Sequence, residues 1–143
     1  MVEVSNQDAR QLSSDLVVLS ARLVREVRRN TSELPAASTR LMSLLDELGP
    51  SSISSLAESD RCSQPTMTGL VNGLVAKGWV RRDPNPGDAR STLISMTDEG
   101  RRKLTAVRRR NAALVAERIA ASGRSTEELA TAVAVLNDLL RRD

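Results

Sequence analysis

Apolar residues recur along this chain at intervals of three and four positions, the spacing that places side chains on one face of an α-helix. The first such stripe lies within residues 7–29 and consists of Leu12, Leu16, Leu19, Leu23 and Val27. It predicts a long helix whose apolar face needs a partner. A second helix is expected to begin near Pro35 and to end at Gly49-Pro50. Its predicted inner face is made of Leu41, Leu44, Leu45 and Leu48.

Two shorter helices joined by a tight turn are predicted next. Ser52 can cap a helix over residues 53–60, and Ser63 can cap another that carries Pro65 in its first turn and ends at Gly78. Only Arg61-Cys62-Ser63 separates these two helices. Their predicted inner-face residues are Leu56, Ala57, Met67, Leu70, Val71, Leu74 and Val75.

The periodicity changes after Gly78. Residues 79–82 are rich in types that strands accept, Pro84-Asn85-Pro86-Gly87 is a concentrated turn signal, and residues 92–96 alternate in polarity. This pattern predicts a β-hairpin.

Two further helices are predicted after the hairpin. The first begins with Asp98 and Glu99, which suit a helix start by charge, and it runs to about Ala121. Thr97 and Gly100 form only an imperfect cap there. Its apolar face is made of Leu104, Val107, Leu114 and Val115, with Asn111 interrupting. A capping box of Ser125 and Glu128 starts the last helix, whose apolar residues are Leu129, Val133, Leu136, Leu139 and Leu140.

The predicted fold class is mainly α with a small β-hairpin: a winged helix-turn-helix flanked by N- and C-terminal helices. In such a fold, a capped helix with small polar residues at its N-terminus can enter the major groove of DNA. The hairpin can then reach along the backbone to the adjacent minor groove.

Composition removes most catalytic chemistry. The 143 residues include no histidine and a single cysteine, so neither a nucleophile–histidine pair nor a histidine-rich zinc site can be built. No phosphate-binding loop or paired carboxylates stand out. We therefore expect no enzyme activity, no cofactor and no metal. Cys62 lacks an intrachain partner, and neither a signal peptide nor a membrane-spanning run is apparent, which favours a cytoplasmic protein that does not enter a membrane.

Positive charge is concentrated in the middle of the chain. Residues 61–103 carry eight basic and four acidic groups, while the formal charge of the whole chain is +3. The excess suggests a polyanionic partner for this stretch. The alternative is codon bias in a GC-rich genome, because nearly all the basic residues are arginine.

The middle of the chain resembles the MarR (multiple antibiotic resistance regulator) family of transcription factors. The resemblance covers residues 52–104. It rests on Leu56-Ala57, Ser63-Gln64-Pro65-Thr66, Leu70-Val71, Leu74, Gly78-Trp79-Val80, Arg82, Asp88-Ala89-Arg90 and Thr97-Asp98-Glu99-Gly100. It implies one MarR-like domain over 1–143, with a DNA-binding lobe over 32–100 and dimerisation helices over 6–30 and 101–143.

The resemblance also implies a set of residues that contact double-stranded DNA: Ser63, Gln64, Pro65, Thr66, Thr68, Asn72, Arg82, Asp88 and Arg90. Arg90 would enter the minor groove, oriented by a charge-assisted bond from Asp88. Gln64 could read adenine. The alternatives are helix capping and solvation for the polar helix residues, and a surface hairpin with a weak salt bridge for the wing.

Two glycines depart from the family pattern. Members often carry basic residues near positions 69 and 73, and this chain has Gly69 and Gly73. Each lowers helix propensity by roughly 1 kcal/mol. They either permit close approach of the backbone to DNA or loosen the helix.

The resemblance implies a homodimeric repressor that binds a palindromic operator, with half-sites ~34 Å apart. A small aromatic or anionic effector could release it, although no residue identifies one. A redox role for Cys62 and an inert thiol are both left open. The alternative function is a protein-interaction module in which the winged helix serves as scaffold.

Overall fold

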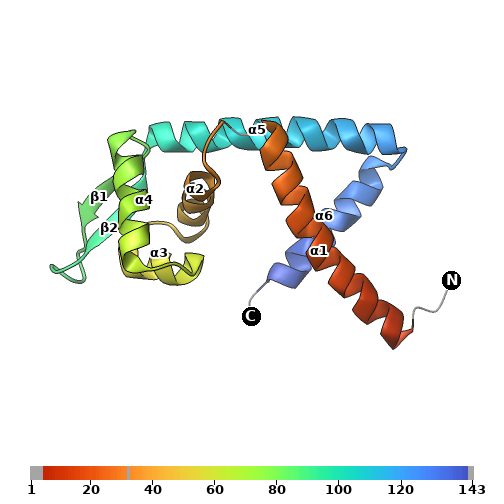
Figure 1. Cartoon of the computed structure of the whole chain (residues 1–143), viewed down its shortest axis with the longest axis horizontal. Coiled ribbons are helices and arrows are strands. Elements are labelled where there is room, and N and C mark those ends of the chain that lie inside the picture. The colour runs from red at the N-terminus through yellow and green to blue at the C-terminus, as the bar shows by residue number, and fades with distance from the viewer. Residues whose placement is uncertain (1–4, 32, 142–143) are drawn as a thin grey trace. The chain divides into compact units, whose positions relative to one another are not determined.

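The structure is a computed structural model that describes residues 5–31 and 33–141, and within these ranges it has six helices and two strands (Figure 1). The elements are α1 (Asn6–Thr31), α2 (Ala36–Leu48), α3 (Ile53–Asp60), α4 (Gln64–Ala76), β1 (Val80–Pro84), β2 (Thr92–Met96), α5 (Asp98–Ser122) and α6 (Thr126–Leu140). Their order confirms the predicted fold class, a mainly helical chain with one hairpin. None of the described helices is long and apolar enough to cross a membrane.

The chain divides into two compact units. One, here called the helical unit, is formed by Met1–Thr31 and Arg109–Asp143, and the other, the winged unit, is Ser32–Arg108. Helix α5 starts in the winged unit and ends in the helical unit. The single domain predicted over 1–143, with its lobe over 32–100, stays a prediction, and residues 1–4, 32 and 142–143 of these ranges lie outside the described residues.

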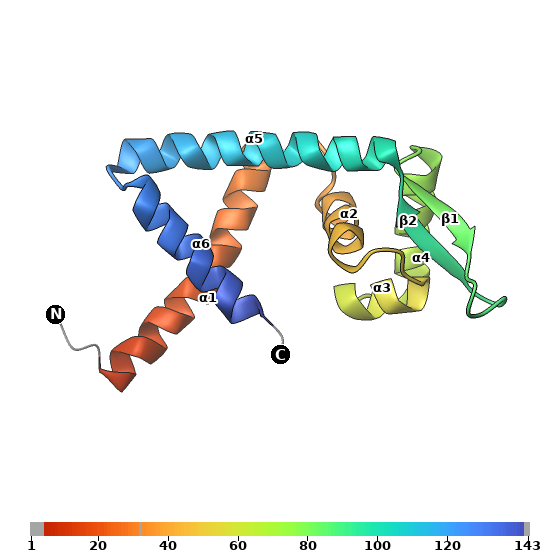
Figure 2. The same ribbon diagram turned by 180° about the vertical axis from the view of Figure 1, so that it is seen from behind.

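The core of the winged unit is built from α2, α3, α4, the hairpin and the start of α5 (Figure 2). Its buried residues are Leu41, Met42, Leu45, Leu56, Ala57, Met67, Val71, Leu74, Val80, Ile94 and Leu104. Burial of this apolar surface is the main force that holds the unit together. The core holds one face of α4 inward and leaves the opposite face of this helix in solvent.

The inner face of α2 differs from the prediction at two positions. Leu48 is 48% exposed, whereas Met42 is completely buried. The buried stripe is Ser38, Leu41, Met42 and Leu45, which already spans two helical turns, and Leu48 is the last residue of the helix. A prediction based on leucines alone therefore placed the inner face three positions, about one helical turn, too far along the chain.

The hairpin is tied to the helices at two places. Strand β1 pairs antiparallel with β2, with Val80 opposite Met96 and Arg82 opposite Ile94. Ser51, just before α3, exchanges both backbone hydrogen bonds with Ile94, at 3.0 and 2.8 Å. The base of the hairpin is thus continuous with the helix-turn-helix.

A close packing contact joins the hairpin to α5. The Thr97 hydroxyl accepts a hydrogen bond from the Gly100 N–H at 3.1 Å and donates to the Gly78 carbonyl at 2.6 Å. The Thr97 N–H donates to the Trp79 carbonyl at 3.0 Å. A Cβ on Gly100 would lie only 2.1 Å from that same carbonyl oxygen. The cap that looked imperfect in sequence is therefore a junction that only glycine fits.

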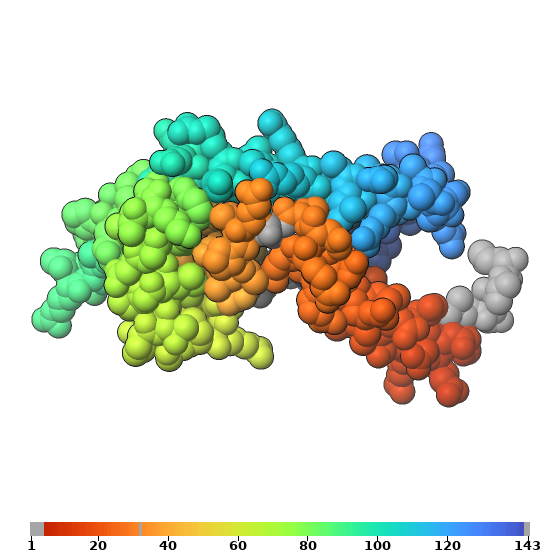
Figure 3. Space-filling model, turned by 45° about the horizontal axis from the view of Figure 1, so that its top comes forward, coloured from red at the N-terminus to blue at the C-terminus, as the bar shows by residue number. Residues whose placement is uncertain are grey.

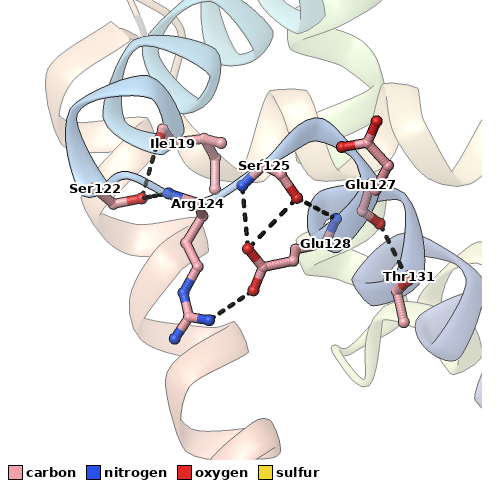
Figure 4. A network of polar contacts seen from close by, with 7 residues as sticks. All are labelled: Ile119, Ser122, Arg124, Ser125, Glu127, Glu128 and Thr131. Carbon is pink, nitrogen blue, oxygen red and sulfur yellow. Dashed lines mark hydrogen bonds and ion pairs between the residues drawn. The ribbon is translucent and has the colours of Figure 1, made fainter.

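In the helical unit, polar contacts link α1 to α5, and a local capping box begins α6. Thr31 lies 2.6 Å from Asn111 Oδ1, which explains a polar residue within the apolar stripe of α5, and Arg118 lies 3.4 Å from Glu26. At the start of α6 the predicted capping box is present: Ser125 Oγ accepts from the Glu128 N–H at 3.1 Å, and Glu128 accepts from the Ser125 N–H (Figure 4).

Candidate nucleic-acid interface

The turn between α3 and α4 is short and well anchored. Arg61 adopts the left-handed conformation (φ 51°) that ends α3, and the Cys62 N–H donates to the Ala57 carbonyl at 3.0 Å. Cys62 is half-buried and packs against the core. Asp60, whose side chain is only 7% exposed, receives two hydrogen bonds from Arg40, at 2.5 and 3.0 Å. These hydrogen bonds raise the pKa of Arg40 and attach the end of α3 to α2.

Ser63 begins α4 as predicted. Its hydroxyl accepts from the Thr66 N–H at 3.2 Å and donates to the Thr66 hydroxyl at 2.8 Å. Its oxygen is therefore engaged in capping. The neighbouring Gln64 donates from Nε2 to the Ser54 hydroxyl at 3.1 Å, so the first residue of α4 is tied to α3.

One face of α4 is open to solvent. Met67, Val71 and Leu74 face the core. The exposed residues of the helix include Gln64, Pro65, Thr66, Gly69, Asn72 and Gly73, while Thr68 is half-buried. A Cβ at Gly69 or Gly73 would have no heavy atom within 4 Å, so both glycines leave the helix backbone open.

Two arginines follow α4 on β1, and they have different partners. Arg82 donates from Nη2 to the side-chain oxygen of Asn72 on α4. Arg81 instead pairs with Asp83 on its own strand, at 2.8 Å. The structure thus brings Asn72 and Arg82, both candidate DNA-contacting residues, into direct contact. No local sequence signal could reveal this contact, because it joins a helix to a strand.

The tip of the hairpin is a polar turn. The side-chain oxygen of Asn85 accepts from the Gly87 N–H at 3.0 Å, and its amide nitrogen donates to the Ser91 hydroxyl at 2.9 Å. Asp88 accepts from the backbone N–H of Arg90 at 2.9 Å. Figure 3 shows the hairpin loop projecting from the winged unit.

The structure contains a charge-assisted bond between Asp88 and Arg90, as predicted, and it is made to the backbone. The carboxylate binds the backbone of Arg90, not its guanidinium, and the described residues contain no ion pair between the two side chains. Because the two residues are separated by only one position, an Asx-type turn to the backbone is the geometry that the short Asp side chain reaches most easily. Both side chains are exposed.

The candidate site is made of polar and cationic groups. Within residues 5–31 and 33–141, no group of three or more His, Cys, Asp or Glu residues could hold a metal ion. Behind the site, Lys77 and Lys103 lie 4.8 and 5.5 Å from the centroid of the Trp79 ring. Sequence reasoning missed this lysine–tryptophan contact, in which Lys103 of α5 meets the turn that carries Lys77 and Trp79.

The fold and site define a winged helix-turn-helix protein. The family model described as "MarR family" matches residues 34–92. The HTH-type transcriptional regulator MT0903.1 of Mycobacterium tuberculosis is 33% identical over 133 residues, which cover 92% of each chain. The chain belongs to the MarR family, and it is a transcriptional regulator, not an enzyme.

Further similarities agree with this assignment. The HTH-type transcriptional repressor NicR of Pseudomonas putida is 35% identical over 63 residues, 44% of this chain and 40% of NicR. A putative transcriptional regulator from Pseudomonas aeruginosa has a similar structure, with a TM-score of 0.76, 26% identity and coverage of 97% of this chain and 99% of that one. Wild-type MarR from E. coli shares the fold, with a TM-score of 0.68, 20% identity and coverage of 99% of both chains.

Proposed function

We propose that this regulator is a homodimeric repressor that binds a palindromic DNA operator. In each protomer α4 enters a major groove and the hairpin places Arg90 in the adjacent minor groove. A regulator of this kind acts on the chromosome, in keeping with the predicted cytoplasmic location. The observation that carries the proposal is the guanidinium of Arg90, which is exposed at the tip of an ordered turn and has no partner among the described residues. A narrow minor groove attracts such a group.

The exposed face of α4 supports the same function. Gln64, Thr66 and Asn72 offer amide and hydroxyl groups, which read base edges or bind phosphates. Arg82, Asp88, Pro65, Ser63 and Thr68 complete the proposed contact set, with Ser63 and Asp88 acting through the conformation of the backbone that they hold.

Exposed apolar surface supports the dimer. Among the described residues, the exposed large hydrophobic side chains are Leu12, Val17, Val18, Leu19, Leu23, Val24, Leu48, Val133, Val135, Leu136, Leu139 and Leu140. All except Leu48 lie on α1 or α6 of the helical unit. An apolar groove of about 510 Å³ lies between these helices. A surface of this kind marks a protein–protein interface.

Repression follows from occupancy, because a dimer bound over a promoter excludes other proteins from it. The name of the relative NicR, a repressor, agrees with this role. For an effector, a polar pocket of about 220 Å³ on α1, lined by Arg22, Arg25, Glu26 and Arg29, favours an anionic compound. Adding an aromatic carboxylate such as benzoate to the protein–DNA complex tests release directly.

Arg90→Ala tests the DNA-binding proposal. Duplexes are first selected from a random pool by the wild-type chain, and affinity is then measured by fluorescence anisotropy at several salt concentrations. Good base-edge and groove contacts contribute about 1–3 kcal/mol each. Arg90→Ala removes one such contact from each protomer of the proposed dimer, so it should weaken binding by at least about tenfold. It should also flatten the salt dependence.

Arg109→Ala is the matched control. It removes the same charge from an exposed position on α5 in the helical unit, and it should leave affinity nearly unchanged. Equal affinity of the Arg90→Ala variant and the wild type would refute the wing assignment. A wild-type chain that selects no preferred duplex would instead favour the protein-interaction alternative.

A further inference from the structure

The second half of α4 offers one polar side chain. Residues 69–76 read Gly-Leu-Val-Asn-Gly-Leu-Val-Ala, so Asn72 is the only residue among them whose side chain can form hydrogen bonds. Gly69 and Gly73 flank it without covering it. Base edges opposite this half of the helix would therefore meet no other polar side chain from α4.

Arg82 fixes the orientation of the Asn72 amide. Its Nη2 group donates to Asn72 Oδ1. A guanidinium carries only donors, so turning the amide over would oppose its NH2 group to the N–H groups of Arg82. The oxygen therefore stays with Arg82. The Nδ2 amino group, with two hydrogens, has no partner among the described residues and is left for a ligand.

Gln64 lacks this constraint. Its partner is the hydroxyl of Ser54, 3.1 Å away. A hydroxyl both donates and accepts, so either orientation of the Gln64 amide forms a hydrogen bond there. Gln64 keeps the ability to read adenine, whereas the orientation of Asn72 is determined.

We infer that Asn72 and Arg82 form a donor-only pair that selects guanine in the major groove. The inference rests on the proposed function. A free asparagine reads adenine with two bonds, accepting from N6 and donating to N7. Arg82 already donates to the oxygen that the first bond needs, so the N6 group of adenine would have to share that oxygen with a cation. Guanine presents O6 and N7, two adjacent acceptors, and these match the two hydrogens of Nδ2. Arg82 is thus a positioning residue that sets specificity through Asn72.

The test compares sequence preferences across five chains. Wild type, Arg82→Met, Arg82→Lys, Arg81→Met and Asn72→Ala each select duplexes from the same random pool, and affinities are then measured for duplexes that differ at one base pair. Arg81→Met is the matched control, because it removes the same charge from the neighbouring residue, which pairs with Asp83 and not with Asn72.

We expect the wild type, Arg81→Met and Arg82→Lys to prefer guanine at one position in each half-site. In Arg82→Met the freed oxygen should shift the guanine-to-adenine affinity ratio at that position by about tenfold toward adenine. Asn72→Ala should lose the preference there alone.

Two results would overturn the inference while leaving the proposed function intact. In the first, Arg82→Met weakens binding to all duplexes alike, as expected for a phosphate contact. In the second, Asn72→Ala keeps every base preference. A wild-type chain without any base preference would instead overturn the proposed function itself.

Discussion

Gly100 and Gly69, two glycines in helices of the winged unit, differ in what surrounds them. Gly100 lies at the junction between the hairpin and α5, and Gly69 lies on the exposed face of α4. A Cβ on Gly100 would lie 2.1 Å from the carbonyl oxygen of Trp79, whereas one on Gly69 would have no heavy atom within 4 Å. Gly100 is therefore required by packing. Gly69 lowers helix propensity without any packing reason, which points to a role at the exposed face of α4.

Gly100→Ala should reduce the free energy of unfolding by about 3 kcal/mol, because the clash is with backbone that cannot rotate away. Gly69→Ala, the matched control in the same unit, should instead raise it by up to ~1 kcal/mol. Urea denaturation followed by circular dichroism measures both. Similar effects of the two substitutions would contradict the packing contact between Gly100 and Trp79.

At the wing tip, substitutions of Asp88 can separate the effect of its hydrogen bond to the Arg90 backbone from the effect of its negative charge. Its carboxylate accepts from the Arg90 N–H at 2.9 Å, a bond that a neutral amide oxygen can also accept. We expect Asp88→Asn to keep DNA affinity close to that of the wild type, and Asp88→Ala to weaken it several-fold by loosening the turn. Anisotropy titration with one selected duplex measures this difference. If both variants lost affinity equally, Asp88 would act on Arg90 through its charge.

At the scale of helices and strands, local patterns were sufficient. Caps at Ser52, Ser63 and Ser125 and the turn residues after Pro84 placed the elements within a few residues of their observed bounds. These signals are local, because a cap or a turn depends on residues within four positions of one another.

Contacts between elements were not predictable in this way. The pairing of Asn72 with Arg82 and the fit of Gly100 against Trp79 depend on how a helix and a strand approach each other in space. The choice of Met42 over Leu48 for the core of α2 has the same origin, since it depends on where the neighbouring elements pack. Local patterns thus placed the candidate residues on their helices and strands, but the partner of each side chain was not predictable.

Asp46 links α2 to α5 through two arginines. It accepts from Arg108 at 2.7 Å and from Arg101 at 3.1 Å. These contacts, the Arg108 hydrogen bond above all, hold the pKa of Asp46 below its usual value of 3.8. Because the pKa is lower in the folded chain than in the unfolded one, the contribution of Asp46 to stability is fully present above pH 3.8. It is lost as the pH falls through the folded value.

Asp46→Asn should therefore lower Tm at pH 7, and its difference from the wild type should shrink below pH 3.8. Differential scanning calorimetry at several pH values measures the trend. Glu47→Gln, at the neighbouring exposed carboxylate, is the control and should keep Tm close to the wild-type value. If the Tm difference between Asp46→Asn and the wild type stayed constant with pH, the contacts of Asp46 with the two arginines would not contribute to stability in the way proposed.

For the molecule as a whole, the helical unit is the part that a single chain leaves incomplete. No residue of α6 is buried, and on α1 only Val27 is. The apolar stripes on these helices thus remain in water in one copy. A second copy can cover them, and a stable interface of this type buries roughly 1,600 Å². In the proposed homodimer, DNA binding would depend on the helical unit indirectly, because the dimer would join two half-site contacts.

Leu19→Glu should separate the dimer. Leu19 is 55% exposed and lines the groove between α1 and α6 together with Leu136, so a carboxylate there would be buried without a partner in the dimer. Light scattering should give twice the 15.5 kDa chain mass for the wild type and a single chain for the variant. Ser59→Glu, at an exposed position on α3 of the winged unit, introduces the same charge outside the helical unit and should stay dimeric. The Leu19→Glu variant should also lose most of its affinity for a duplex with two half-sites while keeping its helical content. A wild type of single-chain mass, or a dimeric Leu19→Glu variant, would show that this surface has another partner.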